Sequence, residues 1–313
     1  MHHILPLVLL SLACTPPADT GPKADDTGPG PTRTTPPPTF ITDVPARLVA
    51  LGDVHGDLEA TRAALRLAGA IGDDDAWAGG ELVLVQTGDQ IDRGPDDRAI
   101  LDLFEALADQ AAAAGGAVYA LWGNHEVMNV ELDLRYVHED AWASFDDTEY
   151  DPEDAELASY TEAQRGRVAA FRPGGPYAAV LAGRNGVMVV GETAFVHGGL
   201  LPDHVSYGVE TFNAEVQAWM RGETSETGLI LQSDSPVWAR TYSEDVGTLE
   251  CAQLTTALDT LGAARMVVGH TIQDEINPAC DGEIWRIDVG MSEYYGGSPA
   301  VLEITQDGVS VIE

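Results

Sequence analysis

The chain has 313 residues, of which 44% are hydrophobic, so it can bury a substantial core and is not disordered throughout. Its formal net charge of −35 is extreme, and residues 1–42 contribute little of it. Such a surface repels nucleic acid and anionic membranes, and the sequence has no run of Lys or Arg, so we exclude nucleic acid as a partner. It also repels anionic substrates, which means that a site for an anion must supply its own positive field from metals or arginines.

The N-terminal segment predicts an export signal. An apolar run from Ile4 to Ala13 is too short to span a bilayer and has the length of a signal-peptide core. The string "SLAC" resembles the lipobox of bacterial lipoproteins, in which the cysteine, here Cys14, becomes the lipidated first residue. We expect a signal peptide over residues 1–14 and export as a membrane-anchored lipoprotein, periplasmic or at the cell surface. The alternatives are cleavage without lipidation and no export, and the lipid anchor is the one membrane association that we expect.

Residues 15–42 are rich in Pro, Thr, Gly and Asp, cannot bury a core, and are expected to form a disordered linker. From Pro45 onward the sequence has no second linker and no internal repeat, so we expect one folded domain over residues 43–313. An oxidising compartment would permit a disulfide between Cys251 and Cys280, and two separate buried thiols are the alternative. Neither cysteine lies beside a candidate base, so no cysteine nucleophile is expected.

Strand and helix patterns alternate in the first half of this domain. They predict strands at residues 47–51, 81–87 and 117–122, and helices at Leu58–Ala70 and Asp96–Ala113. This alternation predicts parallel pairing with right-handed crossovers. The runs at 186–191 and 193–199 predict a hairpin, and further strands are expected at 264–270, 283–290, 300–305 and 309–313, with a helix near Glu250–Leu261. The combination favours an α/β fold of two packed mixed β-sheets flanked by helices.

The predicted strand ends carry residues that can bind metals. They read "LGDVHGD", "QTGDQIDRG", "LWGNHEVMN", "FVHGG" and "VVGHT". Taken singly, an Asp after a strand is often a helix N-cap, and a lone His is more often a structural residue. Open α/β sheets bind their ligands at strand ends, so five such strings in succession indicate one shared site.

These strings resemble the motifs of the metallophosphoesterase superfamily. "GDVHGD", "GDQIDRG", "GNHE" and "HGGL" narrow the resemblance to the PPP phosphoprotein phosphatases. "GNHEVMNVELDLRYV", "SPVWAR", "VVGHT" and "DVGMSEYYGG" look most like the bacterial, Shewanella-like protein phosphatase branch. The resemblance covers about Leu48 to Ile304 and implies that residues 43–313 form a metallophosphatase catalytic domain with the α/β/β/α sandwich of this superfamily.

The resemblance also implies a site with two divalent metal ions, which would be either Mn or Fe/Zn. Asp53 and His55 would bind the first metal, Asp89 would bridge both, and the second would be bound by Asn124, His197 and His270. Carboxylates and imidazoles suit these metals. Two such ions roughly 3.5 to 4 Å apart can hold phosphoryl oxygens and lower the pKa of a bridging water, so that hydroxide forms near neutral pH.

Other residues of the same motifs would act on the substrate. By the resemblance, His125 does not bind metal but is the general acid for the leaving group, and Asp92 orients it and favours its charged form. Arg93 and Arg240, together with Asn124, would hold the phosphate oxygens. Asp57 and Glu126 are expected to be helix-capping or supporting groups. His138, His204 and the acid-rich stretch 146–156 are given no role.

Three functions remain open from the sequence. The leading hypothesis is a phosphomonoesterase that acts on phosphoprotein Ser, Thr or Tyr. The alternative is hydrolysis of small phosphoesters, such as dinucleoside polyphosphates or phosphodiesters. The third is a non-catalytic metal-binding protein, which the complete set of predicted ligands disfavours.

Overall fold

The computed structural model describes residues 35–226, 228–230 and 232–313. The predicted signal peptide over residues 1–14, and the part of the predicted linker before residue 35, lie outside the described residues. Among the residues that are described, no helix is long and apolar enough to cross a membrane.

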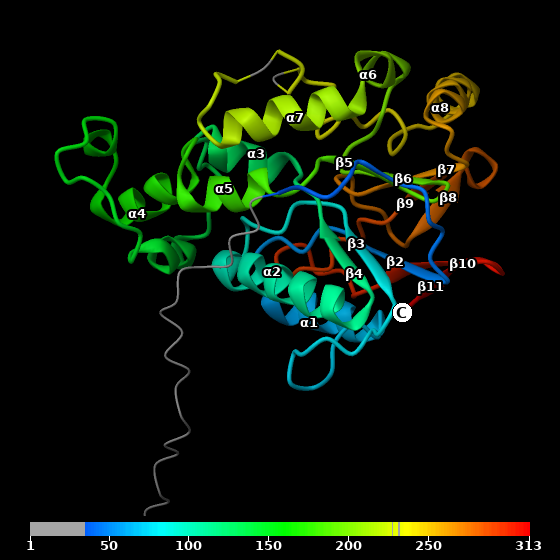
Figure 1. The fold of residues 1–313 in the computed structure, drawn as a ribbon, viewed down its shortest axis with the longest axis horizontal. Helices are drawn as coiled ribbons and strands as arrows, with labels where there is room; N and C mark the ends of the chain where they lie inside the picture. Colours follow the sequence, from blue (N-terminus) through cyan, green and yellow to red (C-terminus); the bar gives the residue numbers. More distant parts are fainter. Residues whose placement is uncertain (1–34, 227, 231) are drawn as a thin grey trace, which may run out of the picture. The chain divides into compact units, whose positions relative to one another are not determined.

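The described chain folds into two mixed β-sheets with helices on both outer sides, which confirms the predicted fold class (Figure 1). One sheet has the strand order β11-β10-β2-β3-β4 and the other the order β1-β5-β6-β7-β9-β8. The strands are β1 (Phe40–Ile41), β2 (Arg47–Leu51), β3 (Val83–Gln86), β4 (Ala117–Ala120), β5 (Val187–Val190), β6 (Thr193–Val196), β7 (Arg265–Val268), β8 (Asn277–Ala279), β9 (Ile284–Arg286), β10 (Val301–Thr305) and β11 (Gly308–Ile312). The α-helices are α1 (Leu58–Leu67), α2 (Asp97–Ala114), α3 (Asn124–Val130), α4 (Glu162–Phe171), α5 (Pro176–Ala182), α6 (Pro202–Tyr207), α7 (Val209–Met220) and α8 (Thr248–Leu261).

The first half of the domain follows the predicted alternation of strand and helix. Strands β2, β3 and β4 pair in parallel, and α1 and α2 form the two crossovers between them. Asp57 begins α1, because its Oδ1 accepts the N–H of Ala60 at 2.9 Å. The helix ends before the predicted Ala70, since Gly69 adopts a left-handed conformation with φ of 65°. β5 and β6 form the predicted antiparallel hairpin.

Two apolar clusters hold the layers together. The first fills the space between the sheets and under α1 and α2, and includes Leu51, Phe104 and Phe195. The second lies on the outer face of the six-stranded sheet against α5, α7 and α8, and includes Trp122 and Phe212. Because α1 and α2 cover one sheet and α7 and α8 the other, the loops at the carboxyl ends of the strands, with the start of α3, can carry a site.

Two features near the periphery bear on the sequence predictions. Strand β1 lies within the segment assigned to the linker and pairs in parallel with β5, where Val189 N–H donates to Thr39 O at 2.8 Å. Cys251 in α8 and Cys280, which begins a 3₁₀ turn at Cys280–Gly282, form a disulfide. The structure therefore selects the disulfide from the two alternatives that the sequence left open.

Candidate active site

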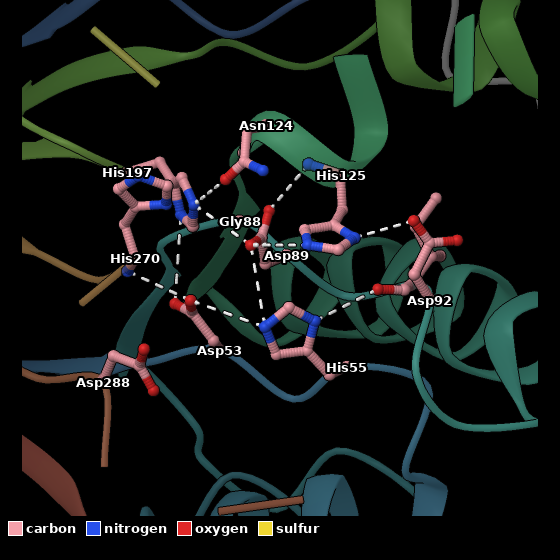
Figure 2. A network of polar contacts seen from close by, with 12 residues as sticks. Asp53, His55, Gly88, Asp89, Asp92, Asn124, His125, His197, His270 and Asp288 are labelled. Atoms are coloured by element: carbon pink, nitrogen blue, oxygen red, sulfur yellow. Dashed lines mark hydrogen bonds and ion pairs between the residues drawn. The ribbon is translucent and has the colours of Figure 1, made fainter. Parts of the chain in front are cut away.

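The loops that follow β2, β3, β4, β6 and β7 bring all six predicted metal ligands to one place, as Figure 2 shows. Each of the six side chains is more than nine-tenths buried, namely Asp53, His55, Asp89, Asn124, His197 and His270. Four of them, His55, Asp89, Asn124 and His270, line a cavity of about 230 Å³, together with Arg93, His125, Tyr136, Trp238, Arg240, Ile272, Asp288 and Tyr295. The site thus has a buried floor of ligand atoms and a wall of aromatic and basic side chains.

Asp89 lies at the centre of this cluster. Its Oδ2 is 3.7 Å from His55 Nε2, on one side, and 3.2 Å from His197 Nε2, on the other. Among the residues that the structure describes, two sets of three side chains have ligand atoms within 4.8 Å of one another: His55, Asp89 and His125, and Asp89, His197 and His270. Asp89 belongs to both sets, so its position suits the bridging role that the sequence assigns to it.

Buried atoms without partners indicate that a cation belongs here. Among the described residues, Asp53 Oδ1 and His270 Nε2 are buried and have no hydrogen-bond partner. Leaving such groups unpaired is unfavourable unless they bind an ion or water. Asn124 contributes an amide oxygen, which lies 2.9 Å from His197 Nε2. Carboxylate, imidazole and amide oxygen donors together fit divalent metal ions.

The protonation states also suit metal binding. Burial lowers the pKa of His55 to about 4, and burial with the neighbouring His197 and Arg240 holds the pKa of His270 well below its ordinary value. Both imidazoles are therefore neutral and have a lone pair to donate. Burial raises the pKa of Asp53, and the nearby charges of Asp288 and Asp89 raise it further. Bound cations would relieve this crowding of carboxylates.

Hydrogen bonds and tight backbone turns orient the ligands. His197 Nδ1 lies 3.1 Å from Thr87 O, which leaves Nε2 facing the centre. His55, Asp89 and His270 have φ of 44°, 55° and 67°, a conformation that is unfavourable for these residues and typical of functional sites. A Cβ on Gly269 would lie 2.2 Å from Asp53 Oδ1, so only glycine allows the chain to approach this ligand.

His125 and Asp92 form a buried pair beside the cluster (Figure 2). His125 Nδ1 lies 2.7 Å from Asp92 Oδ2, and His125 Nε2 lies 3.9 Å from Asp89 Oδ2. Burial alone would lower the pKa of His125, but the charges of Asp89 and Asp92 outweigh burial and raise it to about 9. The imidazole is therefore protonated at neutral pH in this structure, as the predicted role of a general acid requires.

The two predicted phosphate-binding arginines both line the cavity and come from segments that are far apart in the sequence. The Arg93 guanidinium lies 3.8 Å from the centroid of the Tyr136 ring, and its Nη1 donates to Tyr294 Oη at 3.2 Å. Arg240 Nη1 donates to His270 O at 3.1 Å and to Thr271 Oγ1 at 2.8 Å. Both cations therefore stand beside an acidic centre on a strongly acidic protein.

The residues given supporting roles, or none, lie outside the ligand cluster. Glu126 accepts the backbone N–H groups of Gly123, Asp89 and Gln90 at 2.7–2.8 Å, and so fixes two of the motif loops to each other. Asp57 caps α1 through Oδ1, and its Oδ2 accepts the N–H of Glu293 at 2.7 Å. His138 and His204 do not line the cavity.

Several residues of the site were not predicted from the sequence. Asp288 lies in the loop after β9, is 2% exposed, and accepts the N–H of Gly290 at 2.9 Å. It is also an acid at the end of a predicted strand, in "RIDVG", and that signal could have identified it. Tyr136, Trp238 and Tyr295 lie within the quoted strings "GNHEVMNVELDLRYV", "SPVWAR" and "DVGMSEYYGG", but no role was assigned to them, and the fold shows that they line the cavity.

A two-sheet α/β sandwich that gathers Asp, His and Asn at its strand ends defines a metal-dependent phosphoesterase. Residues 46–274 match the profile described as "Calcineurin-like phosphoesterase", and the chain belongs to this family.

Within this family, the chain is similar to several named protein phosphatases. It is 41% identical over 303 residues to Shewanella-like protein phosphatase 2 of Arabidopsis thaliana, a match that covers 86% of this chain and 78% of the relative. It is 28% identical over 256 residues to Shewanella-like protein phosphatase 1 of Plasmodium berghei (strain Anka), with 79% and 67% coverage. Among solved structures, a cold-active protein tyrosine phosphatase is similar with a TM-score of 0.72 and 25% identity, covering 89% of this chain and 79% of that one. Shewanella-like protein phosphatases are thus its close homologues.

Proposed function

We propose that this protein is a dinuclear-metal phosphoprotein phosphatase that prefers phosphotyrosine. The observation that carries the proposal is the buried His125–Asp92 pair, which lies beside the shared ligand Asp89 and faces a cavity bordered by Arg93 and Arg240. Family membership and the Shewanella-like relatives support the reaction class.

The predicted ligands divide around Asp89. Asp53 and His55 would hold one ion and the second would be held by Asn124, His197 and His270. When bound, two divalent ions would polarise the phosphoryl group and lower the pKa of a water that attacks it. Carboxylate and neutral imidazole donors suit either ion, so the assignment to manganese, iron or zinc stays a prediction.

The chain's own residues would bind the phosphate and protonate the leaving group. Arg93 and Arg240 present planar guanidinium groups that can pair with phosphoryl oxygens. His125 would donate the proton on Nε2 to the leaving oxygen, because its Nδ1 is held by Asp92. Asp92 keeps the imidazole in one orientation and stabilises its charge before transfer.

The wall of the cavity favours an aromatic leaving group. Tyr136, Trp238 and Tyr295 line it, and the Tyr136 ring centroid is 5.2 Å from that of His125. A phenol bound next to His125 could stack against these rings, whereas a serine or threonine side chain is too small to do so. The similarity to a cold-active protein tyrosine phosphatase supports the same preference.

Turnover of four substrates by the full-length protein tests the proposal. The substrates are 4-nitrophenyl phosphate, a phosphotyrosine peptide, a phosphothreonine peptide of the same sequence, and diadenosine tetraphosphate, each with Mn²⁺ and with chelator. We expect metal-dependent turnover with the highest kcat/KM for the phosphotyrosine peptide. Turnover of the dinucleotide alone would establish the small-phosphoester alternative, and no turnover with metal bound would leave a binding protein.

We also propose that the protein is exported and anchored by a lipid on Cys14. The apolar run from Ile4 to Ala13 and the string "SLAC" support this, and the disulfide between Cys251 and Cys280 suits an oxidising compartment. Radiolabelled palmitate should be incorporated into the wild type expressed in a bacterial host but not into Cys14→Ser. Equal labelling of both would contradict lipidation at this residue.

A further inference from the structure

A fully buried arginine lies behind the His125–Asp92 pair. Arg167 is in α4 and is 0% exposed, and the rings of Phe145 and Phe171 have centroids 5.2 Å and 5.0 Å from its guanidinium carbon. Its Nη2 donates to Asp92 Oδ1 at 3.2 Å. The charges therefore form a continuous row, Arg167 to Asp92 to His125, that runs from the helix to the cavity.

The two oxygens of Asp92 have different partners. Oδ1 accepts a hydrogen bond from Arg167, and Oδ2 lies 2.7 Å from His125 Nδ1. Asn129 Nδ2 lies 3.1 Å from both oxygens, and Asn129 Oδ1 in turn accepts from Arg167 Nε at 2.9 Å. Arg167 and Asn129 therefore fix the carboxylate plane and leave Oδ2 directed at the imidazole.

Arg167 also holds the backbone of Asp92. Its Nη1 is 2.6 Å from Asp97 Oδ2, and Asp97 Oδ1 accepts the N–H of Asp92 at 2.9 Å. Asp92 and Arg93 both have positive φ, 68° and 72°, which is unfavourable for these residues without outside support. One guanidinium thus supports the side chain of Asp92 directly and the strained turn through Asp97.

We propose that Arg167 is a positioning residue that acts through Asp92 to aim His125 at the leaving group. This rests on the proposed function, since it assigns Arg167 to the same reaction. Arg167 touches neither the cavity nor any predicted metal ligand, so its effect on the imidazole of His125 passes through Asp92. Asn129 adds a second, indirect contact, because it accepts from Arg167 and donates to the backbone O of His125 at 2.9 Å.

Kinetics with two leaving groups test this proposal. Protonation matters more for the alcohol of a phosphothreonine peptide than for 4-nitrophenol, which leaves readily without it. Arg167→Met should lower kcat for the peptide by about tenfold or more, lower it less for 4-nitrophenyl phosphate, and leave KM nearly unchanged. In an Asp92→Asn background the same change should have a much smaller further effect, because the path through Asp92 is already broken and only the contact through Asn129 remains.

Loss of Arg167 removes the buried cation that pairs with Asp92 and Asp97 and can unfold the protein, so a second variant is needed. Arg167→Lys keeps the positive charge but cannot reach Asp92, Asn129 and Asp97 together, and it should show the same dependence on leaving group. Arg172→Gln, at the end of the same helix, removes an ion pair with Asp154 and should change neither substrate's kcat. An equal loss on both substrates, or full additivity with Asp92→Asn, would overturn the proposal.

A readout without turnover separates this inference from the proposed function. The metal-free wild type should show a downfield proton NMR signal from the Nδ1–H of His125, identified by its loss in His125→Asn. The signal should shift or disappear in Arg167→Lys and persist in Arg172→Gln. If the wild type hydrolyses no phosphoester, the proposed function fails, whereas an unchanged signal in Arg167→Lys contradicts the positioning role alone.

Discussion

At the scale of single residues, the ligand cluster depends on a close backbone approach that only glycine allows. Gly269 precedes His270, and its Cα faces Asp53 so closely that an added Cβ would lie 2.2 Å from Asp53 Oδ1. His270 N–H donates to Asp53 Oδ2 at 3.0 Å, so this short segment fixes two predicted ligands at once.

Gly269→Ala should therefore weaken metal binding while leaving most of the fold intact. The added methyl group must push Asp53 or the chain before His270 out of place, and displacements of this size upset ligand geometry. We expect metal content after dialysis to fall well below that of the wild type, measured by atomic emission. Gly228→Ala, where nothing lies within 4 Å of the added Cβ, should retain its metal. Equal metal content in both variants would show that the site tolerates the methyl group.

His125 and Asp89 should differ in what their loss removes. His125→Asn is expected to keep bound metal and to lower kcat by about 100-fold, most for poor leaving groups, because it removes the proton donor. Asp89→Asn is expected to lose metal as well, since Asp89 lies within reach of the imidazoles on both sides. Metal analysis and kinetics on the same preparations check both. If the folded His125→Asn protein bound no metal, His125 would be a metal ligand and not the general acid. The geometry allows this, because a ring nitrogen of His125 lies within 4.8 Å of the ligand atoms of His55 and Asp89.

At the scale of elements, α3 carries both Asn124 and His125, and the residue that follows it, Glu131, lies beside a second acid, Glu226. Burial and Glu226 raise the pKa of Glu131 to about 8. The folded protein therefore holds a proton here that the unfolded chain releases above about pH 4.5. This contribution to stability is complete below about pH 4.5 and is lost as the pH rises through about 8.

Glu131→Gln should remove that pH dependence. We expect the melting temperature of the variant, relative to that of the wild type, to increase from pH 5 to pH 8.5, because only the wild type acquires a second charge beside Glu226. Measuring both proteins in the presence of chelator keeps metal binding out of the comparison. Glu153→Gln, at an exposed position in the acid-rich loop, serves as the control and should follow the wild type at every pH. A constant difference between Glu131→Gln and wild type would refute the shared proton.

The sequence predicted the elements with local signals and missed those without them. Strands β2, β3 and β4 are continuous apolar runs, and their ends carry the ligands directly, so both could be predicted together. Helix α4 buries Arg167 on its inner face in place of an apolar residue, which hides its amphipathic pattern. Arg167 and Asp92 are 75 residues apart, and no spacing rule connects them. Long-range polar contacts of this kind require the fold.

At the scale of the whole molecule, the charge of −35 opposes the binding of any anionic substrate. The chain has 16 Lys and Arg residues against 51 Asp and Glu residues, so Arg93 and Arg240, the predicted phosphate-binding residues, would have to attract phosphate within a surrounding field that repels it. The screening length is about 10 Å at 0.1 M salt, so salt weakens the effect of distant surface charges more than that of contacts inside the cavity. Ionic strength can therefore separate the field of the molecule from the contacts of the site.

We expect the effect of salt to depend on the charge of the peptide that carries the phosphotyrosine. For a peptide with acidic flanking residues, kcat/KM should rise severalfold between about 10 mM and 150 mM ionic strength, because screening weakens the repulsion. For a peptide with lysines in the same positions, kcat/KM should fall, because screening removes an attraction. Sodium chloride and sodium acetate should give the same result if the effect is screening and not binding of one ion. A change in the same direction for both peptides would mean that salt acts on the site itself and that the surface charge does not steer the substrate.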